Sequence, residues 1–225
     1  MRSLYFFPLT ALFMIGFFLF LIFLFVFVQV GLVSYAYERI GVSANAVFPL
    51  LLCSLFGSAI NIPVTRTRSG PIVSRQVVQF FGAHYVVPVI EDQGTTVIAV
   101  NVGGAIIPTL LSLYLLFTTG LFFRGVLGIA LVTVIANRLA RPLPGVGIAI
   151  PMFIPPIIAA AIGLLLAPEH APALAYIVGT MGCLIGADLL NLHRLAGWGA
   201  PVAAIGGAGT FDGIFLTGIV AVLLT

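Results

Sequence analysis

The fold is decided by residues 6–33, which read FFPLTALFMIGFFLFLIFLFVFVQVGLV. This stretch carries no charged residue and exceeds the roughly 20 apolar residues that a helix needs to cross a bilayer. A signal peptide has an apolar centre of only about 7–15 residues and ends at an A-x-A-like cleavage site. No such site follows here, so we expect an uncleaved first transmembrane span, long enough to tilt strongly.

The composition of the whole chain agrees with a membrane protein. Of its 225 residues, 61% are hydrophobic and 7% are charged, whereas a soluble domain carries about 25% charged residues. We count seven candidate spans between polar breaks, at roughly 6–33, 46–64, 103–119, 121–136, 145–167, 173–190 and 201–224. The sequence therefore predicts one all-α polytopic membrane domain over residues 1–225. The glycines in the first half of the last span favour an unwound backbone there.

One connection, residues 65–101, is long and polar enough to lie outside the bilayer. Two segments within it, His84–Ile90 and Thr95–Asn101, are rich in valine, isoleucine and threonine, which favour strands. Between them, Glu91–Gly94 has the composition of a turn. We therefore expect a small β-hairpin that rests on the helices at one membrane face.

The placement of the basic residues predicts the orientation of the spans. All nine are arginines. With seven spans and a cytoplasmic N-terminus, only Arg39 and Arg124 fall outside, in agreement with the positive-inside rule. The hairpin loop is then cytoplasmic, and we expect a multi-pass protein of the inner or plasma membrane. The net charge of +3 is too small and too scattered for a nucleic-acid partner.

Cysteine and histidine show no pattern of metal ligands. Cys53 and Cys183 lie in apolar runs, which is typical of small core residues. His84, His170 and His193 show no ligand spacing with one another or with cysteine. The sequence predicts neither a metal nor another cofactor. The partners that we expect are the lipid bilayer and, for an enzyme, a membrane-anchored peptide.

Two aspartates lie inside predicted spans, where a carboxylate costs several kcal/mol and usually serves a function. Asp188 lies near the inner end of the sixth span, and Asp212 lies within the seventh. The candidate two-aspartate site therefore covers residues 173–225. Four glycines beside the aspartates are expected to permit close packing or contact with a substrate: Gly186, Gly207, Gly209 and Gly213.

Two carboxylates about 3 Å apart share a proton, so one can act as a base toward water while the other donates to a carbonyl. A regular helix from Pro201 would place Asp212 roughly 16 Å deep and Asp188 about one turn from the surface. The two meet more easily if residues 204–210 are unwound, which their glycines permit. Alternatively, Asp188 could reach interfacial water or pair with Arg194, and Asp212 could cap the last helix.

At these residues the chain resembles two families. Over nearly its whole length it resembles a family of uncharacterised prokaryotic membrane proteins, through the stretches AVNVGGAIIP (99–108), GADLL (186–190) and GAGTFDG (207–213). More distantly, the last two spans resemble intramembrane aspartyl proteases of the presenilin and signal-peptide-peptidase types. Those proteins carry one aspartate near the inner end of a span and a second in a Gly-x-Gly-Asp motif on the next.

The chain departs from the protease pattern in three ways. Two extra residues stand between the glycines and Asp212, Ala187 replaces a common tyrosine, and no later span carries a Pro-Ala-Leu motif. The resemblance implies an intramembrane aspartyl endopeptidase with Asp188 and Asp212 as its catalytic dyad. A proton- or cation-coupled transporter or channel is the first alternative, because an aspartate beside a broken, glycine-rich helix is a common ion site. A non-catalytic membrane scaffold is the second alternative.

Overall fold

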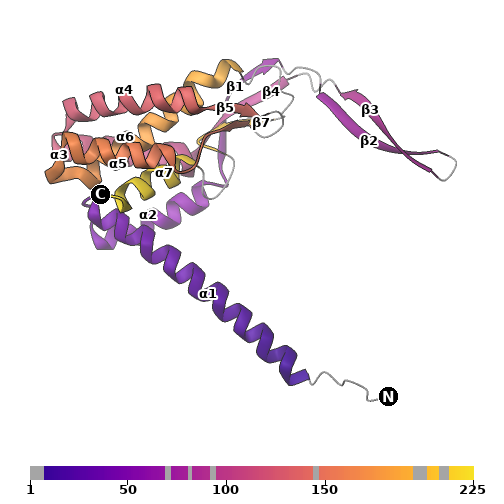
Figure 1. The fold of residues 1–225 in the computed structure, drawn as a ribbon, viewed down its shortest axis with the longest axis horizontal. Coiled ribbons are helices and arrows are strands. Elements are labelled where there is room, and N and C mark those ends of the chain that lie inside the picture. The colour runs from indigo at the N-terminus through magenta and orange to yellow at the C-terminus, as the bar shows by residue number, and fades with distance from the viewer. Residues whose placement is uncertain are drawn as a thin grey trace.

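The computed structural model describes residues 8–68, 72–80, 83–91, 95–143, 147–194, 202–207 and 213–225. Within these ranges the protein is mostly helical, and its strands gather at one end of the helices (Figure 1). Seven α-helices confirm the helical prediction: α1 (Pro8–Arg39), α2 (Ala44–Gly57), α3 (Ile107–Thr119), α4 (Phe122–Leu139), α5 (Ile154–Leu166), α6 (Ala171–Cys183) and α7 (Gly213–Leu223).

Four helical segments are long and apolar enough to cross a membrane, namely Phe13–Arg39, Val102–Thr119, Phe122–Leu139 and Pro168–Leu192. The helices α2, α5 and α7 are apolar but shorter. The expected bounds of the corresponding three spans are therefore wrong at one end each, because part of each stretch is not helical. The described chain thus has the helices of a membrane protein, but of unequal lengths.

Each shortened helix has a local cause. The chain leaves α2 at Gly57 and becomes strand β1 (Asn61–Arg68). Helix α5 begins only at Ile154, and Pro155 and Pro156 occupy its first turn, where a helix needs no N–H donor. The stretch before α7 opens as strand β7 (Val202–Ile205), which agrees with the expected loss of helix there.

The main sheet joins strands that are far apart in the sequence. Strand β4 (Thr95–Asn101) lies between β1, to which it is antiparallel, and β7, to which it is parallel. β4 continues into α3 through η1 (Val102–Ile106), a π-helical turn. β7 is likewise followed by two glycines and, further along, by α7. Two neighbouring parallel strands therefore each lead through a Gly-Gly pair toward a helix of the bundle.

The expected hairpin is wrong in its pairing. Strand β3 (Ala83–Glu91) pairs with β2 (Ile72–Phe80), whereas β4 joins β1 and β7 in a separate sheet. Only residues 81 and 82 separate the paired ends of β2 and β3, and a two-residue connection is the commonest in hairpins. β4, whose side chains are mostly buried, fills the centre of the other sheet instead. In Figure 1 the β2–β3 hairpin projects from the strand end of the molecule. A second small pair, β5 (Arg141–Leu143) and β6 (Gly147–Ala149), follows α4.

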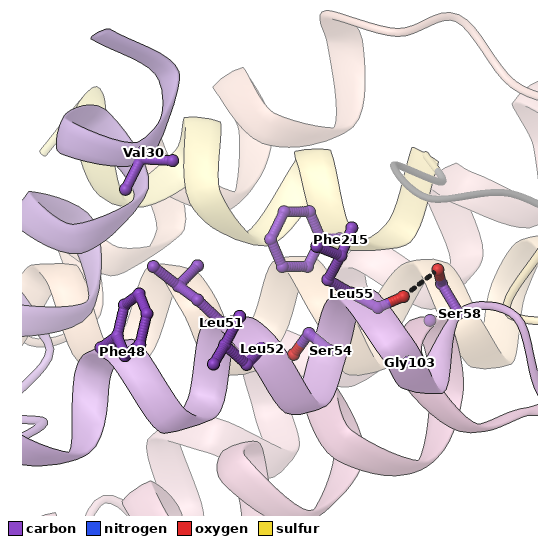
Figure 2. Close-up of a pocket in the computed structure, with 10 residues that line it drawn as sticks. Val30, Phe48, Leu51, Leu52, Ser54, Leu55, Ser58, Gly103 and Phe215 are labelled. Atoms are coloured by element: carbon purple, nitrogen blue, oxygen red, sulfur yellow. Dashed lines mark hydrogen bonds between the residues drawn. The ribbon is translucent and has the colours of Figure 1, made fainter. Parts of the chain in front are cut away.

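Helix α1 leans away from the bundle and packs on it only near its C-terminal end (Figure 1). The packed residues are Val33, Ala36, Tyr37 and Ile40, while the side chains of Phe13–Val30 are exposed. Between α1, α2, η1 and α7 lies an apolar pocket of about 130 Å³ (Figure 2). Its lining residues are Val30, Phe48, Leu51, Leu52, Ser54, Leu55, Ser58, Gly103, Gly104 and Phe215.

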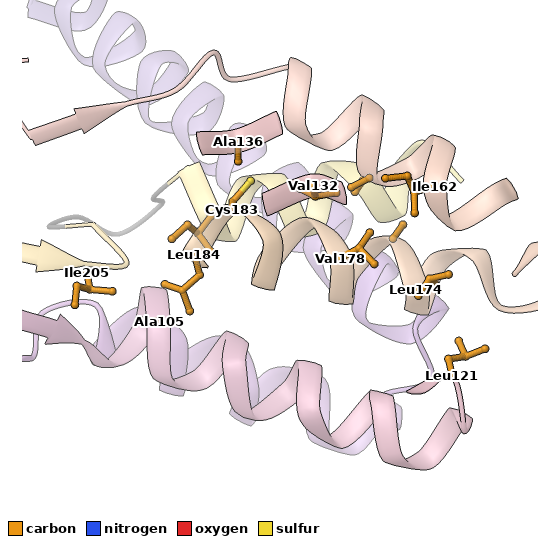
Figure 3. Packing of buried hydrophobic residues seen from close by; sticks show 14 of the residues in the cluster. Ala105, Leu121, Val132, Ala136, Ile162, Leu174, Val178, Cys183, Leu184 and Ile205 are labelled. Atoms are coloured by element: carbon orange, nitrogen blue, oxygen red, sulfur yellow. The ribbon is translucent and has the colours of Figure 1, made fainter. Parts of the chain in front are cut away.

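Helix α6 forms the centre of the bundle and contacts α3, α4, α5 and α7. Its residues Leu174, Val178 and Cys183 are buried among neighbours from α4 and α5 (Figure 3). Glycines let the helices approach closely, since a Cβ at Gly182 would lie 2.5 Å from Cβ of Val132 on α4. The core therefore holds the C-terminal end of α6, which Asp188 follows, against α4.

Candidate functional site

Asp188 lies where the regular winding of α6 ends. The helix widens at Cys183 into η3 (Leu184–Asp188), a π-helical turn, and continues as η4 (Leu189–Arg194), a 3₁₀-helix. π-Helical turns within helices occur frequently at functional sites. The side chain of Asp188 is half-buried, and its Oδ2 accepts a hydrogen bond of 2.7 Å from the backbone N–H of Gly206. The carboxylate is thus tied to the segment that follows β7.

Gly206 has a backbone conformation that other residues rarely adopt. Its φ is +84°, and that of Gly207 is +76°, both in the left-handed region. A Cβ at Gly206 would lie 2.6 Å from Cβ of Ala105 in η1. A Cβ at Gly104 would lie only 2.0 Å from the carbonyl oxygen of Gly206. Glycine is therefore required on both sides of this backbone contact.

Gly206 connects two π-helical turns. Its N–H donates to Asp188 at the end of η3, and its carbonyl lies against Gly104 in η1. Each turn belongs to one of the long apolar segments. Gly206 belongs to neither of these two segments. It therefore links them at their π-helical turns.

A buried asparagine fixes the second of these turns. Asn101 ends β4, and its Oδ1 accepts a hydrogen bond of 2.7 Å from the N–H of Gly104. Its Nδ2 donates to the carbonyl of Ser58 at 2.8 Å and to Oδ1 of Asn61 at 3.0 Å. The side chain therefore binds the end of α2, the start of β1 and the start of η1 together.

Two further asparagines bind the π-helical turn that carries Asp188. Asn137 on α4 donates to the carbonyl of Gly186 at 3.1 Å. Asn191 donates from its Nδ2 to the carbonyls of Gly186 and Ala187, at 2.9 Å each. Asn191 is buried, so its amide replaces the backbone partners that a regular helix would provide.

The predicted site residues that the structure describes lie in different surroundings. Asp188 accepts a hydrogen bond from Gly206, which directly follows β7, and Gly207 is the next residue. Gly186 packs closely against α4, because a Cβ there would lie 2.4 Å from the carbonyl oxygen of Thr133. Gly213 begins α7 with room for a Cβ, which would lie 3.8 Å from Ile150.

The second aspartate, Asp212, lies outside the described residues, and so does Gly209. The proposed meeting of Asp188 and Asp212 therefore stays a prediction. In the described ranges, no group of three or more His, Cys, Asp or Glu side chains gathers as a metal site would require. Within the described ranges, the site contains one carboxylate, three asparagine amides and closely packed glycines.

Sequence reasoning misses the three asparagines, because Asn101 and Asn191 fall at the ends of expected loops and Asn137 in the break after the fourth span. The signal that could find them is chemical: an amide in a mostly apolar chain needs several hydrogen-bond partners, and broken helices supply free carbonyls. Each asparagine lies within a few residues of a glycine or strand junction, where such free groups occur.

The arrangement holds a carboxylate beside the end of an edge strand, β7. In the part of the chain that the structure describes, the main sheet ends at β7 on one side and at β1 on the other. An edge strand presents free N–H and C=O groups to which an extended peptide can add. Because Gly206 directly follows β7, a peptide bound at that edge would pass near Asp188.

Comparisons with known proteins identify a family for this chain but no activity. No curated protein and no solved structure matches the chain. A family model described as "Protein of unknown function (DUF1614)" matches residues 55–224, which is most of the chain. The resemblance to an uncharacterised family is thus confirmed, and the protein belongs to the DUF1614 family.

Proposed function

We propose that the protein hydrolyses a peptide bond of a membrane-anchored substrate, with Asp188 and Asp212 as a catalytic dyad. The observation that carries this proposal is the hydrogen bond of 2.7 Å between Oδ2 of Asp188 and the N–H of Gly206. It ties the carboxylate at the end of α6 to the segment that leads to Asp212, six residues further along. This link supports the pairing of the two aspartates, because six residues span at most about 20 Å even when fully extended.

The chemistry needs one protonated and one ionised carboxyl group. The ionised group accepts a proton from water, and the water oxygen forms a bond to the carbonyl carbon of the substrate. The protonated group donates to the carbonyl oxygen. When the resulting intermediate collapses, the C–N bond breaks, the amine leaves with a proton from the dyad, and a carboxylic acid is released. One water is consumed, and the dyad regains its single shared proton.

The edge of β7 is our candidate for substrate binding. A peptide that pairs there would be extended, which exposes its carbonyl groups to the dyad. We therefore assign the substrate class as a membrane-anchored peptide whose cleavage region can unwind. The glycines at 207, 209 and 213 would leave room for its backbone, whereas Gly186 already packs against α4.

The distribution of the arginines supports a cytoplasmic location for this site. We propose seven crossings with the N-terminus in the cytoplasm, in the inner or plasma membrane. The strands and the end of η4 then lie on the cytoplasmic side, together with Arg66 and Arg141, while Arg39 and Arg124 lie at the opposite end.

The test is cleavage of membrane-anchored reporter peptides by the purified protein in liposomes. Asp188→Asn and Asp212→Asn should each abolish cleavage, and Glu169→Gln is the matched control. Glu169 binds Arg124 in an exposed ion pair formed by α4 and the turn before α6, so this change removes a carboxylate far from the site. Full activity of the Asp212→Asn protein would eliminate the dyad.

A second test addresses geometry alone. The variant Asp188→Cys, Asp212→Cys, prepared with Cys53→Ser and Cys183→Ala, should form a disulfide under mild oxidation. Such a bond needs Cα atoms within about 7 Å. A pair that never crosslinks, while a control pair elsewhere does, argues against shared catalysis.

One observation favours a transporter or channel as a second candidate. Strand β7 breaks the last apolar stretch, and Gly206 directly after it binds Asp188. Non-helical backbone therefore lies beside the carboxylate, an arrangement that ion-coupled transporters use. Proton or cation flux in liposomes that disappears in Asp188→Asn would support this candidate. If alanine at both aspartates leaves every assayed function intact, a non-catalytic scaffold is the better description.

A further inference from the structure

The end of α6 is held by side-chain amides from two elements. The carbonyl of Gly186 accepts from Nδ2 of Asn137 at 3.1 Å and from Nδ2 of Asn191 at 2.9 Å. The carbonyl of Ala187 accepts from the same Nδ2 of Asn191, also at 2.9 Å. Two consecutive carbonyls, directly before Asp188, are therefore bound by side chains.

These carbonyls matter because of their place in the chain. The carbonyl of Ala187 belongs to the peptide unit that joins Ala187 to Asp188, so its direction fixes the backbone from which the carboxylate extends. The carbonyl of Gly186 belongs to the preceding unit. A rotation of either unit would move the carboxylate away from the N–H of Gly206, which lies 2.7 Å from Oδ2.

The fit of η3 to α4 explains why the second amide comes from that helix. A Cβ at Gly186 would lie 2.4 Å from the carbonyl oxygen of Thr133, so the two backbones touch. Asn137 lies one helical turn after Thr133 on the same face of α4. Asn191, which is 1% exposed, reaches back from η4 to the same carbonyl.

We propose that Asn137 and Asn191 are positioning residues for Asp188. They hold the π-helical turn in one register and thereby direct the carboxylate toward Gly206. This inference rests on the proposed function and deepens it, since it assigns to that site the residues that orient its described carboxylate. It also holds for an ion-binding Asp188, because either role requires a fixed carboxylate.

The experiment follows the Gly206 amide by NMR of the full-length protein in bilayers. Labelling with ¹³C′-isoleucine and ¹⁵N-glycine selects the Ile–Gly peptide bonds, which include Ile185–Gly186 and Ile205–Gly206. Asp188→Asn removes the charged acceptor of the Gly206 N–H. The resulting change in the chemical shift of the Gly206 amide is the reference for the other variants. Asn191→Asp, a change of nearly equal shape without the amide donor, should displace that signal as far.

Two further variants keep the proposal testable. Asn137→Leu removes the second donor at a less buried position, and should displace the Gly206 signal even if Asn191→Asp fails to fold. Asn45→Asp makes the same chemical change at an exposed residue of α2 and should leave the signal in place. In a protein that already carries Asp188→Asn, neither substitution at Asn137 or Asn191 should add a further displacement.

The outcomes separate this inference from the proposed function. If the Asn137 and Asn191 variants displace the Gly206 signal but no peptide is ever cleaved, the positioning role stands and the protease falls. If cleavage is found, these variants should lower kcat by about 100-fold with KM unchanged, as a misplacement near 1 Å would. A Gly206 signal that stays in place in folded Asn191→Asp and Asn137→Leu proteins overturns the positioning role.

Discussion

The contact between Gly206 and η1 makes a sharp prediction about stability. In Gly206→Ala, the new Cβ would lie 2.6 Å from Cβ of Ala105 and 2.7 Å from its backbone nitrogen. Neither neighbour is a flexible side chain, so the backbone must move. The substitution also forces alanine to adopt a φ of +84°. Two separate penalties therefore act at one residue.

Each penalty has a typical size. A left-handed conformation costs an L-residue roughly 1–2 kcal/mol relative to glycine. Overpacking of a tight site costs roughly 1–3 kcal/mol. We expect Gly206→Ala to lower the free energy of unfolding by about 2–5 kcal/mol, which is roughly a thirtyfold change or more in the folding equilibrium.

Two matched variants separate the penalties. Gly120 has a φ of +67°, and a Cβ added there would meet no atom within 4 Å. Gly120→Ala should therefore show only the conformational penalty of about 1–2 kcal/mol. Gly104→Ala adds a Cβ 2.0 Å from the carbonyl oxygen of Gly206. This variant should therefore show the overpacking penalty without the conformational one.

The assay is reversible unfolding of the purified protein in lipid bicelles, followed by the same probe for all three variants. The loss for Gly206→Ala should exceed that for Gly120→Ala by at least about 1 kcal/mol. Equal losses for these two proteins would refute the close approach of Gly206 to η1, and with it the junction on which the candidate site depends.

Three further predictions test other parts of the fold. Asn101→Ala should lower the free energy of unfolding by about 2–4 kcal/mol in the same assay, because it leaves buried backbone groups without partners. Gly182→Ala should lower it by about 1–3 kcal/mol, since its Cβ would lie 2.5 Å from Val132. For orientation, a membrane-impermeant thiol reagent should label Gly120→Cys on intact cells, and label Arg141→Cys only after permeabilisation.

The long helices could be predicted from the sequence because apolar length is the dominant signal for a chain in lipid. Hydropathy does not separate a short helix from a strand when both are buried, so β1 and β7 were hidden in spans expected to be helical. The pairing of β4 with β7, which are about 100 residues apart, depends on tertiary contacts that no local pattern contains.

In the candidate site, too, some residues could be predicted from the sequence and others could not. Asp188 was predictable because a charge in an apolar run is conspicuous. Its partner Gly206 was not, because the hydrogen bond uses a backbone N–H that every residue except proline has. The close packing of Gly186 was predictable from the spacing of small residues, but that spacing does not say which helix approaches.

The length of α1 connects the pocket to the lipid around the protein. Its apolar segment Phe13–Arg39 is about 40 Å long, whereas a hydrocarbon core measures about 30 Å, so a helix of this length fits the core only when it is tilted. Val30 on this helix forms one wall of the apolar pocket, and α2, η1 and α7 form the others. A thinner bilayer would increase the tilt and move that wall relative to its neighbours. Through Val30, the width of the pocket would then depend on membrane thickness as well as on the protein.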